Sequence, residues 1–167
     1  MPDRRRFLQV CAATTTGVVA GCFGGSDDDV LYDRAWSGVT IEKRSGWIRG
    51  VPEFDESNDL TYAVTVAEPV PFDVYVFDRE HTKETYERWI NAPSGMKFET
   101  NGIVGLSGAT ARNVSESIER TAFVDGGRKW VAVDYSDFNG GFPRAEVDGD
   151  SPEEITLDVS IRATAAF

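Results

Sequence analysis

Short runs in which apolar and polar residues alternate cover most of the chain from residue 35 to the C-terminus. Alternation with a period of two is typical of strands that bury one face and expose the other. The clearest runs span residues 36–41, 60–67, 72–78, 115–124, 128–135 and 155–167. Turn signals such as Asp125-Gly126-Gly127 separate them. This pattern predicts a mainly β domain, an antiparallel β-sandwich of about seven to nine strands with jelly-roll or Greek-key-like topology.

The alternation also predicts how the strands present their side chains. In the strand over 72–78, one face carries Phe72, Val74, Val76 and Asp78, and the other carries Asp73, Tyr75 and Phe77. In the strand over 128–135, Trp130, Ala132 and Asp134 lie opposite Val131, Val133 and Tyr135. The final strand turns Ile155, Leu157, Val159 and Ile161 inward. We expect two hairpins: Trp47-Ile48 pairing with 36–41 across Ser45-Gly46, and 128–135 pairing back on an edge strand over 115–124.

One segment, residues 79–91, has helical spacing. Tyr86, Trp89 and Ile90 recur at i, i+3 and i+4, while charged side chains occupy most of the other positions. We therefore expect one short amphipathic helix whose apolar stripe packs against a sheet. The single histidine, His81, falls near the start of this helix and is expected to face solvent.

The first 21 residues have the features of an export signal and are set apart from the fold. Arg4, Arg5, Phe7 and Leu8 resemble the twin-arginine pattern of two arginines, any residue, Phe and Leu. The weakly apolar stretch that follows is shorter than the ~20 residues that a membrane-spanning helix needs. We expect the protein to be exported, already folded, through the twin-arginine route.

A lipobox closes this segment, formed by Val19, Ala20, Gly21 and Cys22. In such a sequence the Cys thiol is acylated and becomes the first residue of the mature chain, so Cys22 is the expected lipidation site. Residues 22–34, rich in Gly, Ser and Asp, are expected to form a flexible acidic tether, and residues 35–167 the β-sandwich domain. The expected location is the extracytoplasmic face of the cell membrane, with the lipid on Cys22 as the anchor.

The charge of the chain restricts its partners. The formal net charge is −11, and removing residues 1–21, which contain three arginines and one aspartate, makes it −13. So negative a surface repels phosphate backbones, which argues against nucleic-acid binding. Only four lysines accompany thirteen arginines. An acidic, lysine-poor surface with a normal apolar fraction is typical of proteins adapted to high salt, where the self-repulsion is screened.

The counts of cysteine and histidine exclude several chemistries. Cys11 leaves with the signal segment and Cys22 is expected to carry lipid, so the mature domain has no thiol for a disulfide. One histidine and no free cysteine exclude a blue-copper centre and the usual zinc sites. No Gly-x-Ser-x-Gly nucleophile motif is present. We expect neither a cofactor nor a conventional catalytic set.

A resemblance to a known group of proteins rests on four segments. They are residues 72–78, the charged helix ending in Tyr86-Glu87-Arg88-Trp89, the strand from Lys129 to Asp134 and the alternating C-terminal strand. Together, over roughly residues 60–167, they resemble a group of haloarchaeal twin-arginine-exported lipoproteins. These are in turn similar to extracytoplasmic β-sandwiches of the pre-peptidase C-terminal or GOLD kind. The resemblance implies a fold and a location, with no activity.

Three functions remain open from the sequence. The first is a non-enzymatic binding module whose partner is a surface protein or a glycan, with the loop aromatics Trp47, Phe54, Phe138 and Phe142 as candidate contact residues. The second is a calcium-binding domain, for which Asp134, Asp137, Asp148 and Asp150 offer hard oxygen ligands. The third is a hydrolase with a pair of carboxylates, which requires a deep pocket that contains both. Asn113-Val114-Ser115 also fits the N-glycosylation acceptor pattern, which makes Asn113 a candidate modification site.

Overall fold

The computed structural model describes residues 29–92, 105–136, 138, 147 and 149–166, which form eight strands and one helix. The strands are β1 (Val30–Glu42), β2 (Ser45–Phe54), β3 (Asn58–Val66), β4 (Phe72–Phe77), β5 (Ala111–Val114), β6 (Ile118–Val124), β7 (Gly127–Tyr135) and β8 (Glu154–Ala165). The helix α1 (Glu80–Ile90) follows β4 along the chain. Within these residues no helix has the length and apolarity to cross a membrane.

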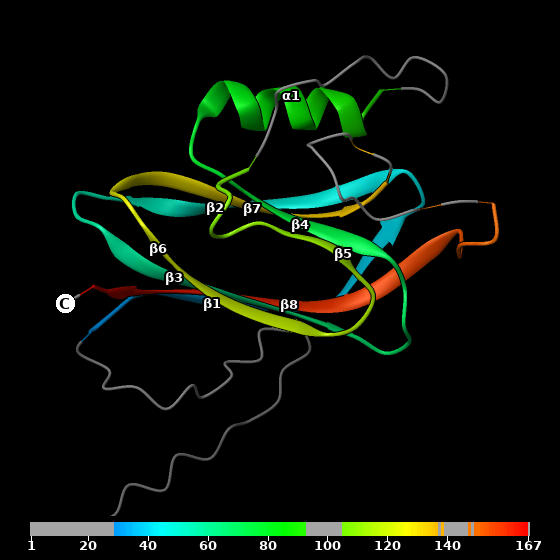
Figure 1. Ribbon diagram of the computed structural model, residues 1–167, viewed down its shortest axis with the longest axis horizontal. Coiled ribbons are helices and arrows are strands. Elements are labelled where there is room, and N and C mark those ends of the chain that lie inside the picture. The colour runs from blue at the N-terminus through cyan, green and yellow to red at the C-terminus, as the bar shows by residue number, and fades with distance from the viewer. Residues whose placement is uncertain (1–28, 93–104, 137, 139–146, 148, 167) are drawn as a thin grey trace, which may run out of the picture.

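The strands form two antiparallel sheets that pack face to face (Figure 1). The strand order is β1-β8-β3-β6 in one sheet and β2-β7-β4-β5 in the other. The antiparallel pairs β1–β8, β2–β7, β3–β6 and β4–β5 are those that arise when one long hairpin is rolled up. This is the jelly-roll arrangement, so the predicted antiparallel sandwich is confirmed and its topology is defined.

The two expected hairpins are wrong, and the first turn lies at Lys43-Arg44, because Ser45 and Gly46 already belong to β2. Strand β1 pairs with β8 and strand β2 pairs with β7, so the connection at Lys43-Arg44 passes from one sheet to the other. In the same way β6 pairs with β3, while β7 pairs with β2 and β4. Tight turns and inward-facing apolar residues are common to a hairpin and to an arch between two sheets, so the local sequence does not distinguish them.

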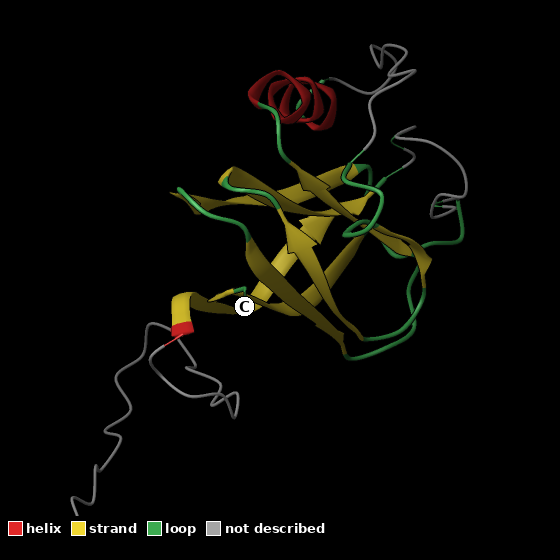
Figure 2. Ribbon diagram, turned by 60° about the vertical axis from the view of Figure 1, so that its left-hand side comes forward, coloured by secondary structure: helices red, strands yellow, loops and turns green. Residues whose placement is uncertain are grey.

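The β2-β7-β4-β5 sheet is covered on both faces. Phe72, Val74 and Val76 of β4 enter the core between the sheets, as the alternation predicts. Tyr75 and Phe77 belong to a second apolar cluster with Tyr86 and Trp89 of α1. The helix thus forms a third layer outside this sheet (Figure 2), and the expected packing of its stripe is confirmed.

The start of the folded domain and one short strand differ from the expectation. Strand β1 begins at Val30 and pairs with β8 from there on, so residues 30–34 belong to the folded domain and not to the tether. Strand β5 was not expected, because Ala111–Val114 is too short to display an alternation. It completes the edge of the second sheet by pairing with β4.

Candidate functional site

Several sequence-predicted site residues lie outside the described part of the chain. They are the export-signal residues Arg4, Arg5, Phe7 and Leu8, the lipobox Val19 to Cys22, and the carboxylates Asp137 and Asp148. Among the candidate metal-binding and modification residues, the structure therefore bears on Asn113, Asp134 and Asp150.

Two aspartates, Asp73 and Asp134, form a buried carboxylate pair beneath α1. They are cross-strand partners in the β4–β7 register, and neither side chain has exposed surface. The Cβ atoms of directly opposite residues in an antiparallel sheet lie about 4.5–5.5 Å apart. Like charges this close in a buried site raise each other's free energy, so the pair depends on nearby hydrogen-bond donors.

The Asp134 carboxylate receives donors from the helix and from its own strand end. The Tyr86 hydroxyl donates to Oδ1 at 2.9 Å, and the Ser136 hydroxyl lies 2.8 Å from both Oδ1 and Oδ2. Burial raises the pKa of Asp134 to about 7, and the neighbouring Asp73 adds to this, while the bonds from Ser136 and Tyr86 oppose it. Asp134 can therefore hold or release a proton near neutral pH.

The Asp73 carboxylate joins β4 to the edge strand β5. The Tyr75 hydroxyl donates to Oδ2 at 3.1 Å, and the backbone N–H of Asn113 donates to Oδ1 at 2.6 Å. Asn113 has a φ of 54°, a left-handed conformation that asparagine adopts more readily than most residues. The Arg112 guanidinium lies 5.9 Å from the centre of the Tyr75 ring and supplies positive charge beside the pair.

An aromatic layer closes this cluster from the helix side. The Phe138 ring packs edge-to-face on Tyr75, Tyr86 and Trp89, with centroids 5.4, 5.0 and 5.2 Å apart. Because these rings and both carboxylates are buried, the cluster holds α1 on the sheet and presents no open carboxylate. This carboxylate pair is therefore enclosed, whereas the hydrolase hypothesis requires a pair that lines a deep pocket.

The calcium candidates do not form a common site in the described residues. Asp134 is fully buried in its hydrogen-bond network, whereas Asp150 is exposed in a turn between β7 and β8. In the part of the chain that the structure describes, no three His, Cys, Asp or Glu side chains are grouped so as to hold a metal ion.

A cavity of about 300 Å³ opens at the end of the sandwich where β6 turns into β7. We call it the end pocket. It is lined by Asp78, Leu106, Ser107, Gly108, Ala109, Phe123, Val124, Asp125, Gly126 and Lys129. Its volume lies at the lower end of the range for small-molecule sites, and its mixture of apolar surface with a few polar groups is typical of them.

Glycine positions the turn that borders the end pocket. A Cβ atom on Gly126 would lie 2.8 Å from the Asp55 carbonyl oxygen and 3.0 Å from that of Phe54. Gly127 adopts a φ of 94°, which favours glycine. The turn between β6 and β7 therefore packs closely on the turn between β2 and β3, and this contact fixes one wall of the pocket.

Lys129 places a nearly buried ammonium group in the end pocket. The residue is only 4% exposed, and its Nζ donates to the carbonyl oxygens of Gly126 at 2.9 Å and Gly127 at 3.3 Å. Burial lowers the pKa of Lys129, and the carboxylates of Asp78 and Asp125 partly oppose this. An ammonium has three N–H donors, so one has no acceptor among the described residues.

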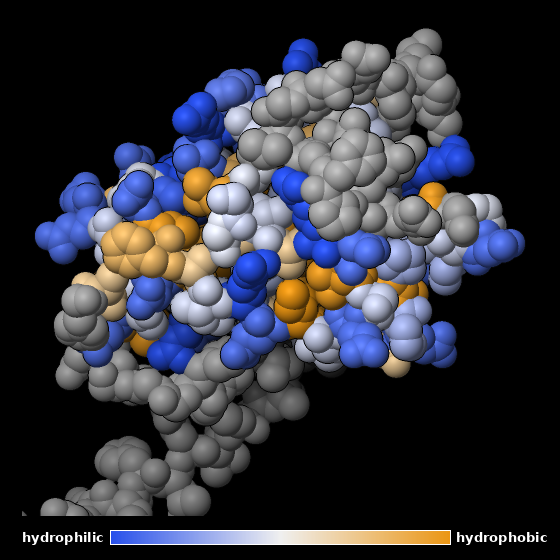
Figure 3. Space-filling view, viewed as in Figure 1, coloured by the Kyte–Doolittle hydropathy of each residue, from blue (hydrophilic) through white to orange (hydrophobic). Residues whose placement is uncertain are grey.

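Phe123 gives the pocket an exposed aromatic rim. Its side chain is 64% exposed, and the other large hydrophobic side chain found exposed in the described residues is Leu31, at 45%. Apolar side chains also reach the surface toward this end in the space-filling view (Figure 3). Single exposed apolar residues are common, but an aromatic ring at the mouth of a polar cavity is a typical binding feature.

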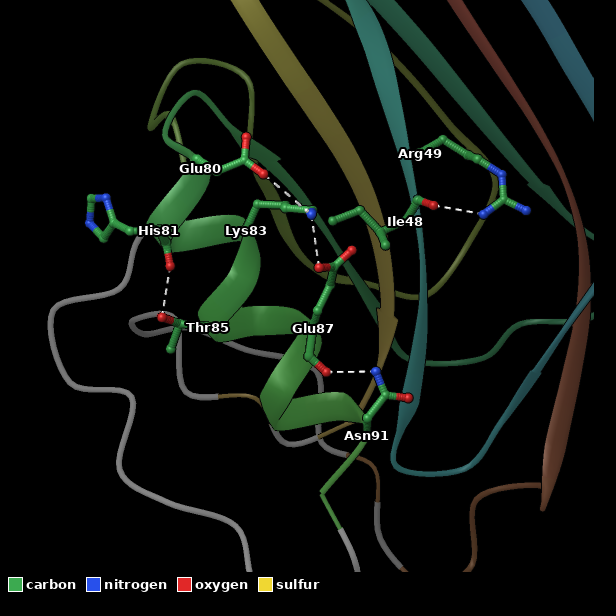
Figure 4. A network of polar contacts seen from close by, with 8 residues as sticks. All are labelled: Ile48, Arg49, Glu80, His81, Lys83, Thr85, Glu87 and Asn91. Atoms are coloured by element: carbon green, nitrogen blue, oxygen red, sulfur yellow. Dashed lines mark hydrogen bonds and ion pairs between the residues drawn. The ribbon is translucent and has the colours of Figure 1, made fainter.

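A second, more open hollow follows the outer face of α1 and is lined by His81, Glu84, Thr85, Glu87, Arg88 and Asn91. His81 is exposed and points away from the sheet, as predicted (Figure 4). On the side nearer β2, Lys83 bridges Glu80 at 3.5 Å and Glu87 at 2.9 Å. These contacts are ordinary surface helix pairs that contribute a few tenths of a kcal/mol each.

Trp47 and Phe138, two of the four candidate contact aromatics, are buried and are not part of an exposed contact surface. Trp47 lies in β2 and packs edge-to-face on Trp36 in the core, with centroids 5.1 Å apart. Phe138 is fully buried under α1, Phe54 packs partly buried against the core, and Phe142 lies outside the described residues. The aromatic residue that the sequence reading missed is Phe123.

The candidate modification site Asn113 lies in β5 with its side chain exposed. Glycosylation there stays a prediction. No protein-family model matches this chain, and no curated protein matches its sequence. The fold and the two polar sites are therefore the basis for a functional proposal.

Proposed function

We propose that this protein is a lipid-anchored binding module on the outer face of the cell membrane, and that it acts without catalysis. The observation that carries the proposal is the position of Cys22: it ends a sequence with the features of an export signal and a lipobox, and only seven residues separate it from β1. Seven residues span at most about 25 Å when fully extended. The anchor would therefore keep the jelly roll close to the membrane surface.

The binding role is supported by the contrast between the two polar sites. The Asp73–Asp134 pair is enclosed and engaged by internal donors, which suits a structural role. The end pocket is open, is lined by both donors and acceptors, and carries an exposed ring. Fold alone does not imply a function, so the binding part of the proposal depends on this pocket.

Two substitutions test the anchor, in a host with a twin-arginine export pathway. Cys22→Ala should release the protein into the medium, because no acyl chain can be attached. Cys11→Ala is the matched control: it removes the other thiol of the same segment and should leave the protein in the membrane fraction. Fractions are washed with high salt and alkaline carbonate, and mass spectrometry determines whether Cys22 carries lipid.

The export route is tested with the double variant Arg4→Lys, Arg5→Lys. If the twin-arginine route is used, the precursor should accumulate inside the cell with its signal segment intact. A Cys22→Ala protein that stays in the membrane fraction, or a native N-terminal peptide without lipid, contradicts the anchoring part of the proposal.

A further inference from the structure

We infer that the end pocket binds a hydroxylated sugar ring, with Phe123 as the stacking platform and with Asp78, Asp125 and Lys129 as hydrogen-bonding groups. The inference rests on the proposed binding role and names the class of ligand. It follows from the combination of groups that the pocket holds.

The polar groups match a ligand that both donates and accepts hydrogen bonds. The carboxylate oxygens of Asp78 and Asp125 accept hydrogen bonds, and the spare N–H of Lys129 donates one. A sugar hydroxyl does both, so the hydroxyls of a sugar ring are suitable partners for all three groups. Hydrogen bonds to charged partners are stronger than neutral ones and give specificity for hydroxyl-bearing ligands.

The same groups disfavour ionic ligands. A divalent cation would lie close to the Lys129 ammonium, which interacts with both Asp78 and Asp125. An anion would meet two carboxylates on a chain whose net charge is −11. A neutral ligand avoids both penalties, and its binding does not weaken as salt screens the charges.

The exposed ring supplies the apolar part of sugar recognition. The face of an aromatic ring is negative, and it packs against the polarised C–H bonds on one face of a pyranose. Phe123 follows Glu119 and Thr121 at alternate, exposed positions of β6, where a polar residue would be expected. Its neighbour Val124 and the pocket residue Leu106 continue the apolar surface inward.

The position of the pocket relates it to the anchored end of the chain. The pairs Val30↔Thr164, Asn58↔Ala165 and Asn58↔Val124 place the start of β1 and the end of β6 at the same end of the sandwich. Figure 1 shows the start of β1, the end of β8 and the β6–β7 turn together there. The sugar could thus belong to a membrane glycolipid or to a soluble glycan, and the chemistry of the pocket is the same for both.

The test uses the full lipoprotein, purified in a detergent without a sugar headgroup, at high salt. Saturation-transfer NMR is recorded with glucose, galactose, mannose, glucosamine and glucuronate as probes, and with cyclohexylamine as a ring-shaped amine without hydroxyls. We expect transfer to at least one neutral hexose, equal or stronger transfer to glucosamine, and weaker transfer to glucuronate.

Matched variants locate the binding. Phe123→Ala should weaken hexose binding by about ten-fold or more, because stacking and apolar burial are lost together. Leu31→Ala removes the other exposed large side chain, which does not line the pocket, and should leave binding unchanged. Lys129→Met should also weaken binding, and an unfolding curve for each variant shows whether the fold is intact.

Three results would overturn the inference: no transfer to any hexose, hexose binding that survives in folded Phe123→Ala, or cyclohexylamine binding as tightly as glucosamine. Flotation of the soluble Cys22→Ala protein with glycolipid vesicles, with and without free hexose as competitor, distinguishes the two sources of sugar. Sugar binding is measured independently of location, so its failure is distinct from a failure of the anchor.

Discussion

We expect the buried Asp134 to contribute a loss of stability as the pH rises from about 4 to about 7. Its pKa is raised from 3.8 to about 7 by burial. The unfolded chain therefore loses this proton near pH 4, while the folded chain keeps it until about pH 7. The stabilisation from a carboxyl group with a raised pKa is complete when the pH is below the pKa of the unfolded chain. It is lost once the pH exceeds the pKa of the folded protein. Three pKa units at 1.36 kcal/mol each correspond to about 4 kcal/mol.

Asp134→Asn removes the titration and keeps the size of the side chain and one carbonyl oxygen for the Tyr86 donor. At pH 4 the variant should be equal to the wild type or up to about 2 kcal/mol less stable, because one hydrogen bond is altered. The difference in unfolding free energy should then shift in favour of the variant by about 4 kcal/mol by pH 8. Urea unfolding, followed by tryptophan fluorescence at constant salt, measures both proteins at each pH.

The control is Asp33→Asn, which removes one negative charge from an exposed position of β1. Other carboxylates of the wild type contribute their own pH dependence, so the quantity of interest is the difference between variant and wild type. A difference that stays within 1 kcal/mol from pH 4 to pH 8 would refute the reasoning. It would mean that donors around Asp134 compensate its burial completely.

Three further predictions concern packing. Gly46→Ala should destabilise the protein by about 1–3 kcal/mol, because the added Cβ would collide with the Tyr86 hydroxyl, and urea unfolding should show a smaller cost in a Tyr86→Phe background. Phe138→Ala removes a ring that contacts three others, and a loss of about 3–5 kcal/mol in the same assay is expected. Deleting residues 1–29 should leave the melting temperature unchanged, whereas deleting residues 1–34 should lower it, because β1 loses its pairing with β8 from Val30 onward. Equal melting temperatures for the two deletions would mean that residues 30–34 belong to the tether and not to the folded domain.

Most of the fold follows from periodicity. Alternation gives the faces of β4, β7 and β8 correctly, because one side chain in two must reach the core. Helical spacing gives α1 and its buried Tyr86 and Trp89. The pairing of the strands does not follow from periodicity, since a turn between two strands with inward-facing apolar residues is compatible with a hairpin or with an arch between sheets. Jelly-roll partners such as β1 and β8 lie more than a hundred residues apart in sequence.

The two polar sites were harder to predict, and each left a different signal. Asp73 and Asp134 stand on the strand faces opposite the core, where an aspartate normally meets water. Their burial is indicated by Tyr75, Phe77 and Trp130, which lie on the same strand faces. A surface with these aromatic side chains is too apolar to be exposed and requires a covering element.

Two residues of the end pocket depart from the alternation of apolar and polar positions, in opposite directions. Phe123 is apolar at an outward position of β6, and Lys129 is charged on the face of β7 that turns Val131 to the core. Each exception alone is uninformative, because exposed aromatics and lysines at strand ends are common. Only the arch between β6 and β7 brings them to one cavity, with Asp78 and Asp125 beside them. The strongest indication of a binding site in this chain is therefore that two residues depart from the regular pattern and line the same cavity. Phe123 and Lys129 come from strands in different sheets.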